Sequence, residues 1–312
     1  IKRTIKEPMT FATTTDGNHG RGVAWAAKQV GQHAVVYMPK GSAQERVDHI
    51  LALGAECIVT DMNYDDTVRL TMKMAEERGW YIVQDTAWEG YTKIPTWIMQ
   101  GYATLADEAV EQMQAMGIKQ PTHVLLQAGV GALAGGVLGY LVDCFGAKNL
   151  HSIVVEPDQA DCIYRSGVAG EMVNVGGDMR TIMAGLACGE VSPLAWRFLQ
   201  PAVDLFMTIS DAEAEEAMRE LAAGSHGDIP IVAGESAVAG FAALKNLLAN
   251  PEWKGRAGLT ANARVLLIST EGATAPGVFE RIVGRSHEAV ALAQKEWLKQ
   301  RAPDGFHGRS IA

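Results

Sequence analysis

Short strand-like runs alternate with helix-like segments along this chain of 312 residues, and no other feature constrains its fold as much. The first ninety residues hold strand-like runs at 11–14, 34–38, 56–60 and 80–84, with helical patterns at 20–30, 43–53 and 64–78. A helix between two strands carries the chain back across the sheet, so the strands pair in parallel. The pattern therefore predicts an α/β fold built on open, twisted parallel sheets.

A long helical pattern at 94–117 interrupts the alternation before it resumes. The later segments are strand-like runs at 122–127, 151–156, 205–209 and 264–268, and helical patterns at 137–145, 211–223, 236–249, 275–283 and 286–300. The stretch 158–192 reads as loop. This length is typical of one large or two ordinary domains. We expect a small α/β domain over 1–105 and a large α/β domain over 106–312.

Composition argues against several classes of partner. The net charge is −9 and no long basic run is present, so nucleic acid is not an expected partner. No window of about 18 uninterrupted apolar residues predicts a membrane span. The cysteines lie far apart and form no metal-binding cluster: Cys57, Cys144, Cys162 and Cys188. We expect reduced thiols in a cytoplasmic protein without a metal, while a pairing of Cys162 with Cys188 stays open.

In open parallel sheets, ligands bind beyond the carboxyl ends of the strands, and the first such segment here is unusually polar. It holds Thr13, Thr14, Thr15, Asp16, Gly17, Asn18, His19, Gly20, Arg21 and Gly22, directly before an apolar helical pattern. The free N–H groups and the dipole at a helix start favour an anion, so the segment indicates a carboxylate or phosphate site. An ordinary capped turn is the alternative interpretation.

The second such segment, 127–136, is rich in glycine and lies between a strand and a helix. Glycines let backbone N–H groups approach a phosphate, although tight packing of the helix on the strand explains them equally. The same residues also match a dinucleotide pattern, with Gly129, Gly131, Ala134 and, after the next strand, Glu156. An NAD-dependent oxidoreductase is therefore an alternative, although the motif lies mid-chain after another α/β unit.

The third segment, 269–274, follows the last strand with two hydroxyls, Ser269 and Thr270, which can meet a heteroaromatic ring nitrogen. A simple helix cap before Pro276 is the alternative there. Two acids, Asp16 and Asp85, also follow strands and can face one cleft. Paired acids in a cleft suit proton transfer, whereas each alone is typical of a turn.

Together these motifs resemble the fold type II family of pyridoxal-phosphate (PLP) enzymes, with the tryptophan synthase β-like architecture. The runs 13–22, 84–91 and 174–178 narrow the resemblance to the 2,3-diaminopropionate ammonia-lyases, over roughly residues 9–275. The resemblance implies PLP-dependent α,β-elimination that converts D- and L-diaminopropionate to pyruvate and ammonia. Both enantiomers require a base on each face of the substrate. The family pattern gives Asp16 to the D-isomer, and gives Asp85 to the L-isomer or to the leaving amine.

The resemblance also implies a role for each matching position. Asn18 would bond the PLP ring hydroxyl, and Ser269 or Thr270 would meet the pyridine nitrogen. Backbone N–H groups would hold the phosphate at Gly129, Val130, Gly131, Ala132 and Leu133. The substrate carboxylate would be held by Thr13, Thr14, Thr15 and His19. A small amino-acid substrate, no metal and a homodimer are the further expectations.

The chain departs from the family pattern in one respect. The lysine that forms the family's Schiff base lies well upstream of the asparagine that Asn18 matches, so it has no counterpart here. Lys2 and Lys6 are too close to the first loop, and the chain starts at Ile1 rather than methionine. We therefore expect a fragment of a longer enzyme, with little activity when isolated. The alternatives are a serine or threonine dehydratase, which more often carries serine or alanine at Asp16, and a catalytically silent binding protein.

Overall fold

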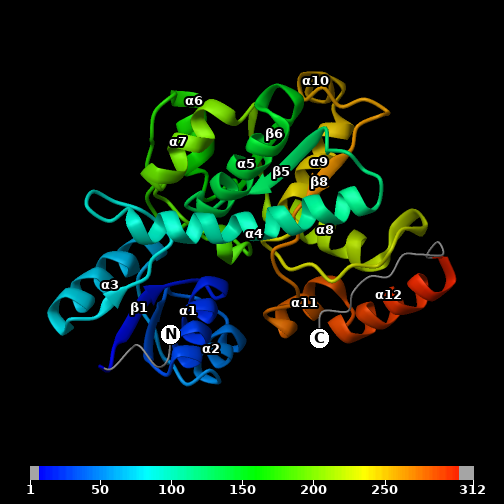
Figure 1. Ribbon diagram of the computed structural model, residues 1–312. Helices are drawn as coiled ribbons and strands as arrows, with labels where there is room; N and C mark the ends of the chain where they lie inside the picture. Colours follow the sequence, from blue (N-terminus) through cyan, green and yellow to red (C-terminus); the bar gives the residue numbers. More distant parts are fainter. Residues whose placement is uncertain (1–6, 302–312) are drawn as a thin grey trace.

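Two parallel sheets organise the computed structural model, which describes residues 7–301 (Figure 1). The first sheet has the order β3-β2-β1-β4, with β1 Thr10–Thr14, β2 His33–Met38, β3 Glu56–Val59 and β4 Tyr81–Ile82. The helices that connect these strands are α1 Asn18–Val30, α2 Gln44–Leu51 and α3 Tyr64–Arg78. All pairs in this sheet are parallel, as the alternation predicts.

The second sheet has the order β7-β6-β5-β8, again with parallel pairs. Its strands are β5 His123–Gln127, β6 His151–Pro157, β7 Leu205–Ile209 and β8 Val265–Leu267. The helices that follow them are α5 Ala132–Phe145, α6 Cys162–Ala169, α7 Pro193–Ala202, α8 Asp211–Ala223, α9 Ala239–Ala249, α10 Pro251–Arg256, α11 Pro276–Val283 and α12 His287–Arg301. The prediction of an α/β fold with two parallel sheets is confirmed.

Both faces of the second sheet are covered, which the sequence of β5 explains. Successive side chains of a strand point to opposite faces. Leu125 packs in a core with α8, α9 and α11, whereas Val124 and Leu126 pack in a second core with α4, α5 and α7. All three side chains are fully buried, so β5 is apolar throughout, as expected for a central parallel strand.

The long helix α4, Lys93–Ala115, lies between the two sheets and packs along α5 (Figure 1). It runs through residue 105, where we placed a domain boundary, so the division of the chain at that point stays a prediction. Within residues 7–301, no helix is both long and apolar enough to cross a membrane.

Some predicted boundaries were wrong. Helix α5 begins at Ala132, five residues earlier than predicted, because Gly131 adopts a φ of 95° and serves as its N-cap. The glycines inside the helix allow close contact with α4: a Cβ on Gly136 would lie 2.6 Å from the Met99 carbonyl oxygen. Helices α6 and α7 occupy 162–169 and 193–202, where no helix was predicted.

Candidate active site

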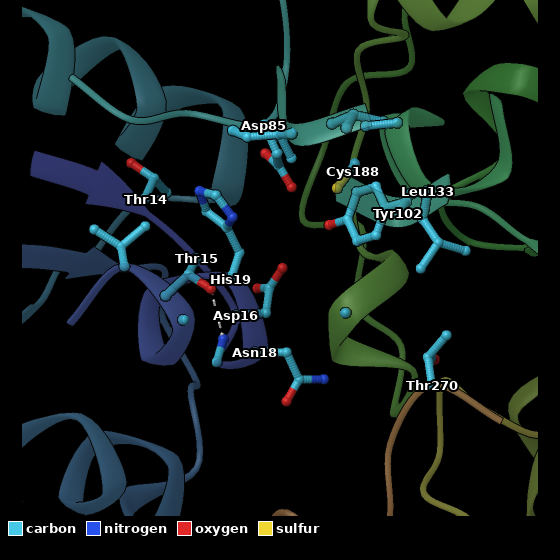
Figure 2. Close-up of a pocket in the computed structure, with 18 of the residues that line it drawn as sticks. Thr14, Thr15, Asp16, Asn18, His19, Asp85, Tyr102, Leu133, Cys188 and Thr270 are labelled. Atoms are coloured by element: carbon cyan, nitrogen blue, oxygen red, sulfur yellow. Dashed lines mark hydrogen bonds between the residues drawn. The ribbon is translucent and has the colours of Figure 1, made fainter. Parts of the chain in front are cut away.

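The carboxyl ends of both sheets border one cavity of about 800 Å³. Its walls come from the segments after β1, β4, β5 and β8, from helices α1 and α4, from the first turn of α5, and from the loop around residues 185–188. Figure 2 shows Asp16, His19 and Asp85 on the side of the first sheet, with Leu133 and Thr270 across from them. The cavity therefore lies where parallel sheets bind ligands, and the three polar segments singled out in the sequence meet there.

The wall after β5 is suited to an anion. Helix α5 has no side-chain cap, and in the described part of the chain the N–H groups of residues 129–134 have no acceptor. All of these residues line the cavity. Free N–H groups and the positive end of a helix dipole favour a phosphate, so the glycine-rich segment fits the phosphate of PLP.

Thr270 lines the cavity at the end of the last strand, whereas Ser269 is exposed and lies outside the lining. Gln127 Nε2 donates to Thr270 Oγ1 at 2.9 Å and to the Ile268 carbonyl oxygen at 2.8 Å. Because the Thr270 oxygen accepts this bond, its own proton is left to donate into the cavity. Of the two predicted hydroxyls, the geometry therefore favours Thr270 for a ring nitrogen.

The threonines after β1 differ in what their hydroxyls do. Thr15 Oγ1 accepts from the N–H groups of Gly17 at 2.9 Å and Gly20 at 3.0 Å, which leaves its proton free to donate. Thr14 lines the cavity, but its Oγ1 lies 2.7 Å from Thr71 Oγ1 on α3. Thr13 lies outside the lining and donates to Gln84 Oε1 at 3.1 Å. Of the three, Thr15 has the hydroxyl best placed for a ligand.

His19 is held by the backbone and lines the same side of the cavity. Its Nε2 lies 2.8 Å from the Val83 carbonyl oxygen, so Nε2 carries a proton. A neutral ring in that tautomer presents Nδ1 as an acceptor. His19 therefore donates to a carboxylate through Nδ1 only in its protonated form.

Asp16 is half-buried and faces the cavity, and no group in residues 7–301 donates a hydrogen bond to it. Burial raises the pKa of this carboxyl well above its ordinary value. The Arg46 guanidinium opposes that shift, whereas the charge of Asp85 adds to it. The carboxylate of Asp16 is thus more basic than that of an exposed aspartate.

Asp85 also faces the cavity but is firmly held. Its Oδ1 accepts hydrogen bonds from the Tyr64 hydroxyl at 3.1 Å and from Gln84 Nε2 at 3.1 Å. The two acids predicted from the sequence therefore lie at one cavity in different surroundings. The sequence reasoning did not single out Tyr64, although it begins helix α3 and lines the cavity.

Asn18 joins the segment after β1 of the first sheet to the segment after β8 of the second sheet. Its Nδ2 donates to Glu271 Oε2 at 2.8 Å, and Glu271 Oε1 accepts from the Ser236 N–H at 3.1 Å. Sequence reasoning missed Glu271 as a wall residue, although it stands beside Thr270 in the third polar segment. Asn18 keeps its carbonyl oxygen for another partner, because only its amide nitrogen is engaged within the described residues.

The structure contradicts the nicotinamide alternative. Glu156 is only 1% exposed, and its two oxygens accept from the N–H groups of Ile163 at 3.0 Å and Tyr164 at 2.6 Å, at the start of α6. A carboxyl buried at a helix start does not reach a ribose. The dinucleotide pattern at Gly129, Gly131 and Ala134 therefore lacks the acidic partner that a nicotinamide cofactor requires.

Comparison with known proteins decides the family. The pattern of the pyridoxal-phosphate dependent enzymes matches residues 1–271. The diaminopropionate ammonia-lyase of Escherichia coli strain K12 is 64% identical over 294 residues, which cover 93% of this chain and 74% of that protein. The chain belongs to the diaminopropionate ammonia-lyase family of PLP-dependent enzymes.

Solved structures of this family agree with the fold described above. The E. coli lyase in complex with an aminoacrylate–PLP azomethine reaction intermediate is 63% identical, with a TM-score of 0.84 over 88% of this chain and 71% of that chain. The same lyase in complex with D-serine is 61% identical, with a TM-score of 0.85 over 93% of this chain and 73% of that chain. The fold type II architecture and PLP as the cofactor are therefore confirmed for this ammonia-lyase family member.

No lysine in residues 7–301 lines the cavity. Lys2 and Lys6 lie outside the described residues. Within the described part of the chain, the N–H groups of residues 129–134, the Thr270 hydroxyl and the Asn18 carbonyl oxygen are available to a cofactor.

Proposed function

We propose that the protein eliminates ammonia from either enantiomer of 2,3-diaminopropionate, giving pyruvate and a second ammonia. One observation carries this proposal. Asp16 and Asp85, which follow the paired strands β1 and β4, face one cavity whose opposite wall is an uncapped helix start. Two carboxyl groups beside one substrate can remove a proton from either side of it. The family to which the chain belongs supports this chemistry.

The residues of the cavity fit PLP. When bound, PLP supplies an electron sink for the electron pair that remains after the substrate loses its proton. We propose that N–H groups of residues 129–133 bind its phosphate. The Thr270 hydroxyl would donate to the pyridine nitrogen, which would then stay unprotonated. Asn18 bonds the ring hydroxyl while Glu271 holds its amide nitrogen.

We assign the two acids to opposite enantiomers, with Asp16 acting on the D-isomer and Asp85 on the L-isomer. The Thr15 hydroxyl binds the substrate carboxylate, since it donates from the wall beside Asp16, and His19 lines the same wall. Thr13 and Thr14 act indirectly, because their hydroxyls are engaged with Gln84 and Thr71.

Asp16→Asn and Asp85→Asn test these roles in the holoenzyme. An amide accepts no proton at neutral pH, so we expect Asp16→Asn to lose about a hundredfold or more of D-isomer turnover and Asp85→Asn as much of L-isomer turnover. Ammonia release and exchange of the α-proton in D₂O measure the two effects. Asp143→Asn, an exposed aspartate outside the cavity, is the matched control. Equal, mild effects on both isomers would remove these residues from the proposed roles.

The substrate is tested by comparing diaminopropionate with serine. The D-serine complex of the E. coli relative makes serine the relevant competitor. We expect diaminopropionate to give the higher kcat/KM, because the chain belongs to the diaminopropionate ammonia-lyase family. A clearly higher value for serine would favour a dehydratase instead.

Binding of the cofactor has its own test. We propose that the described residues hold PLP without a covalent bond. PLP titration followed by borohydride reduction and peptide mapping should give bound cofactor and no labelled lysine in residues 7–301. A labelled lysine in that range would contradict the proposal.

We also propose a homodimer in the cytoplasm. The cysteines among the described residues of this protein are all free thiols, which agrees with a reducing compartment. Light scattering on the purified protein measures the mass in solution, and a monomer at micromolar concentration would argue against the dimer.

A further inference from the structure

Asp85 has two donors on one oxygen and none on the other. Tyr64 and Gln84 both donate to Oδ1, and within residues 7–301 no group donates to Oδ2. We propose that Tyr64 is a positioning residue for the elimination: its hydroxyl fixes Oδ1 of Asp85 and so leaves Oδ2 as the atom that takes the proton. This inference rests on the role proposed above for Asp85.

The direction of the Tyr64 hydroxyl is set by its neighbour. Gln84 Nε2 donates to the Tyr64 oxygen at 2.8 Å, so the single phenolic proton is left for Asp85. Burial and the nearby charge of Asp85 raise the pKa of Tyr64 well above its ordinary value. The phenol therefore stays neutral and remains a donor. Gln84 is itself fully buried, and its Oε1 accepts from the Thr14 N–H at 2.8 Å.

The ring of Tyr64 is fixed by packing against the opposite wall. It is 5% exposed and belongs to one apolar cluster with Val130 and Ala132 of the phosphate loop and with Cys188. Tyr64 therefore spans from the segment that would bind the cofactor's phosphate to the carboxylate that would take the proton. A packed ring with one hydrogen-bonded end holds its hydroxyl at a defined point, which a flexible side chain does not.

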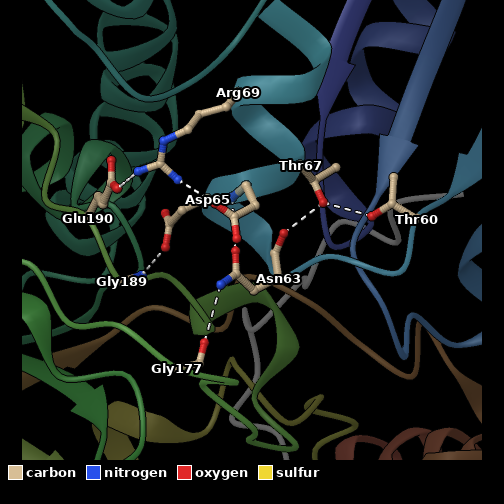
Figure 3. Close-up of polar contacts among 9 residues, drawn as sticks. Thr60, Asn63, Asp65, Thr67, Arg69, Gly177, Gly189 and Glu190 are labelled. Atoms are coloured by element: carbon tan, nitrogen blue, oxygen red, sulfur yellow. Dashed lines mark hydrogen bonds and ion pairs between the residues drawn. The ribbon is translucent and has the colours of Figure 1, made fainter.

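The backbone around Tyr64 is held as well, as Figure 3 shows. Asn63 caps helix α3 and donates from Nδ2 to the Gly177 carbonyl oxygen at 3.3 Å, while Asp65 Oδ2 accepts from the Gly189 N–H at 2.9 Å. Arg69 forms an ion pair with Glu190. These contacts fasten the first turn of α3 to the loop that carries Cys188.

Gly189 is required for this attachment. A Cβ at that position would lie 2.8 Å from Asp65 Oδ2 and 2.1 Å from the Val175 carbonyl oxygen. Only glycine admits the carboxylate so close to the backbone. The loop, α3 and Tyr64 thus form one supported unit behind Asp85.

Asp16 has no such support, since no described group donates to its oxygens. The hydroxyl of Tyr64 therefore affects one side of the substrate only. Its removal should change the reaction of the L-isomer and leave that of the D-isomer intact, which a general loss of folding would not do.

Tyr64→Phe in the holoenzyme tests the inference. A hydrogen bond to a charged group contributes about 1.5 kcal/mol or more, so we expect kcat for the L-isomer to fall about tenfold with little change in KM. The D-isomer should keep its kcat within about twofold.

Tyr140→Phe is the matched control, because Tyr140 donates to the carboxylate of Asp107 on the exposed surface, away from the cavity. A crystal structure of Tyr64→Phe gives a readout independent of turnover: we expect the Asp85 carboxylate to rotate. An unmoved Asp85, or equal losses for both isomers, would overturn the inference. Asp85→Asn in the same assay separates the two proposals, since normal L-isomer turnover there refutes the role of Asp85 itself.

Discussion

The acids of this protein differ by what each one touches rather than by residue type. No described group donates a hydrogen bond to Asp16, whereas two groups donate to one oxygen of Asp85. Both oxygens of Glu156 accept from N–H groups at the start of α6. Asp65 is 8% exposed and accepts a backbone N–H from Gly189. Of these four acids, Asp16 and Asp85 line the cavity and are placed to exchange a proton with a ligand, whereas Glu156 and Asp65 are not.

Asp65 makes stability depend on pH. Burial raises its pKa from 3.8 to about 6, although the Gly189 N–H opposes the shift. The folded state therefore keeps a proton that the unfolded state has lost, and the stability that this proton contributes is lost as pH rises through about 6. Relative to Asp65→Asn, we expect the unchanged protein to lose about 2 kcal/mol of unfolding free energy between pH 4.5 and pH 7.5.

Urea unfolding at the two pH values measures this difference. The amide introduced by Asp65→Asn keeps an oxygen that can accept from the Gly189 N–H, so the variant changes the charge and not the contact. Asp66→Asn is the control, because Asp66 is exposed on the same turn. A pH-independent gap between the unchanged protein and Asp65→Asn would show that Asp65 does not titrate in this range.

At the scale of elements, the start of α5 combines two requirements at one residue. Gly131 has a φ of 95° and N-caps the helix without a side chain, which leaves the N–H groups of the first turn for a ligand. A Cβ there would also lie 3.0 Å from Leu199 Cδ1 and 3.1 Å from Ile163 Cδ1. The glycine thus serves both the conformation of the loop and its packing on α6 and α7.

Gly131→Ala should therefore weaken PLP binding as well as the fold. A positive φ is unfavourable for alanine, and we expect a loss of about 1–3 kcal/mol in unfolding free energy of the apoprotein. Displacement of the N–H groups should raise the Kd for PLP about tenfold, measured by absorbance titration. Gly255→Ala on α10, outside the cavity lining and where a Cβ meets nothing within 4 Å, is the control. Unchanged PLP affinity in Gly131→Ala would argue against this loop as the phosphate site.

At the scale of the whole molecule, the cavity exists because two separate sheets present their carboxyl ends to each other. Contacts across it include Asn18 with Glu271 and a buried ion pair, Arg46 Nη2 to Glu235 Oε2 at 3.4 Å. Arg46 and Glu235 have side chains 6% and 3% exposed. Burial raises the pKa of Glu235, and the Arg46 guanidinium opposes this shift, so Arg46 favours the charged form of Glu235.

Replacing only one partner of this ion pair should lower the unfolding free energy more than replacing both partners. Arg46→Met leaves the buried Glu235 without its partner, and we expect a loss of about 3 kcal/mol or more in unfolding free energy. In the double variant Arg46→Met/Glu235→Gln, at least about half of that loss should return. Urea unfolding of the two single variants and the double variant measures the coupling. If the losses of unfolding free energy in the two single variants add up to the loss in the double variant, the ion pair does not stabilise the fold.

Local pattern was enough for much of the fold and part of the site. The alternation of strands and helices predicted both parallel sheets, and the polar segments after β1, β5 and β8 do meet at one cavity. The prediction failed where local signals conflict with packing. The glycines at 132–136 suggested a loop but lie inside α5, since close contact with Met99 of α4 requires small residues there.

The residues at strand ends are determined by the sequence itself, because a parallel sheet brings the carboxyl ends of neighbouring strands to one edge. That rule, applied to the sequence alone, predicts Asp16 and Asp85 at the cavity but leaves Ser269 and Thr270 as alternatives, of which only Thr270 lines it. The tertiary structure alone decided what supports them: Tyr64 and Gln84 behind Asp85, Glu271 beside Asn18. Such partners come from distant parts of the chain, and their approach depends on how helices pack, which no local pattern records.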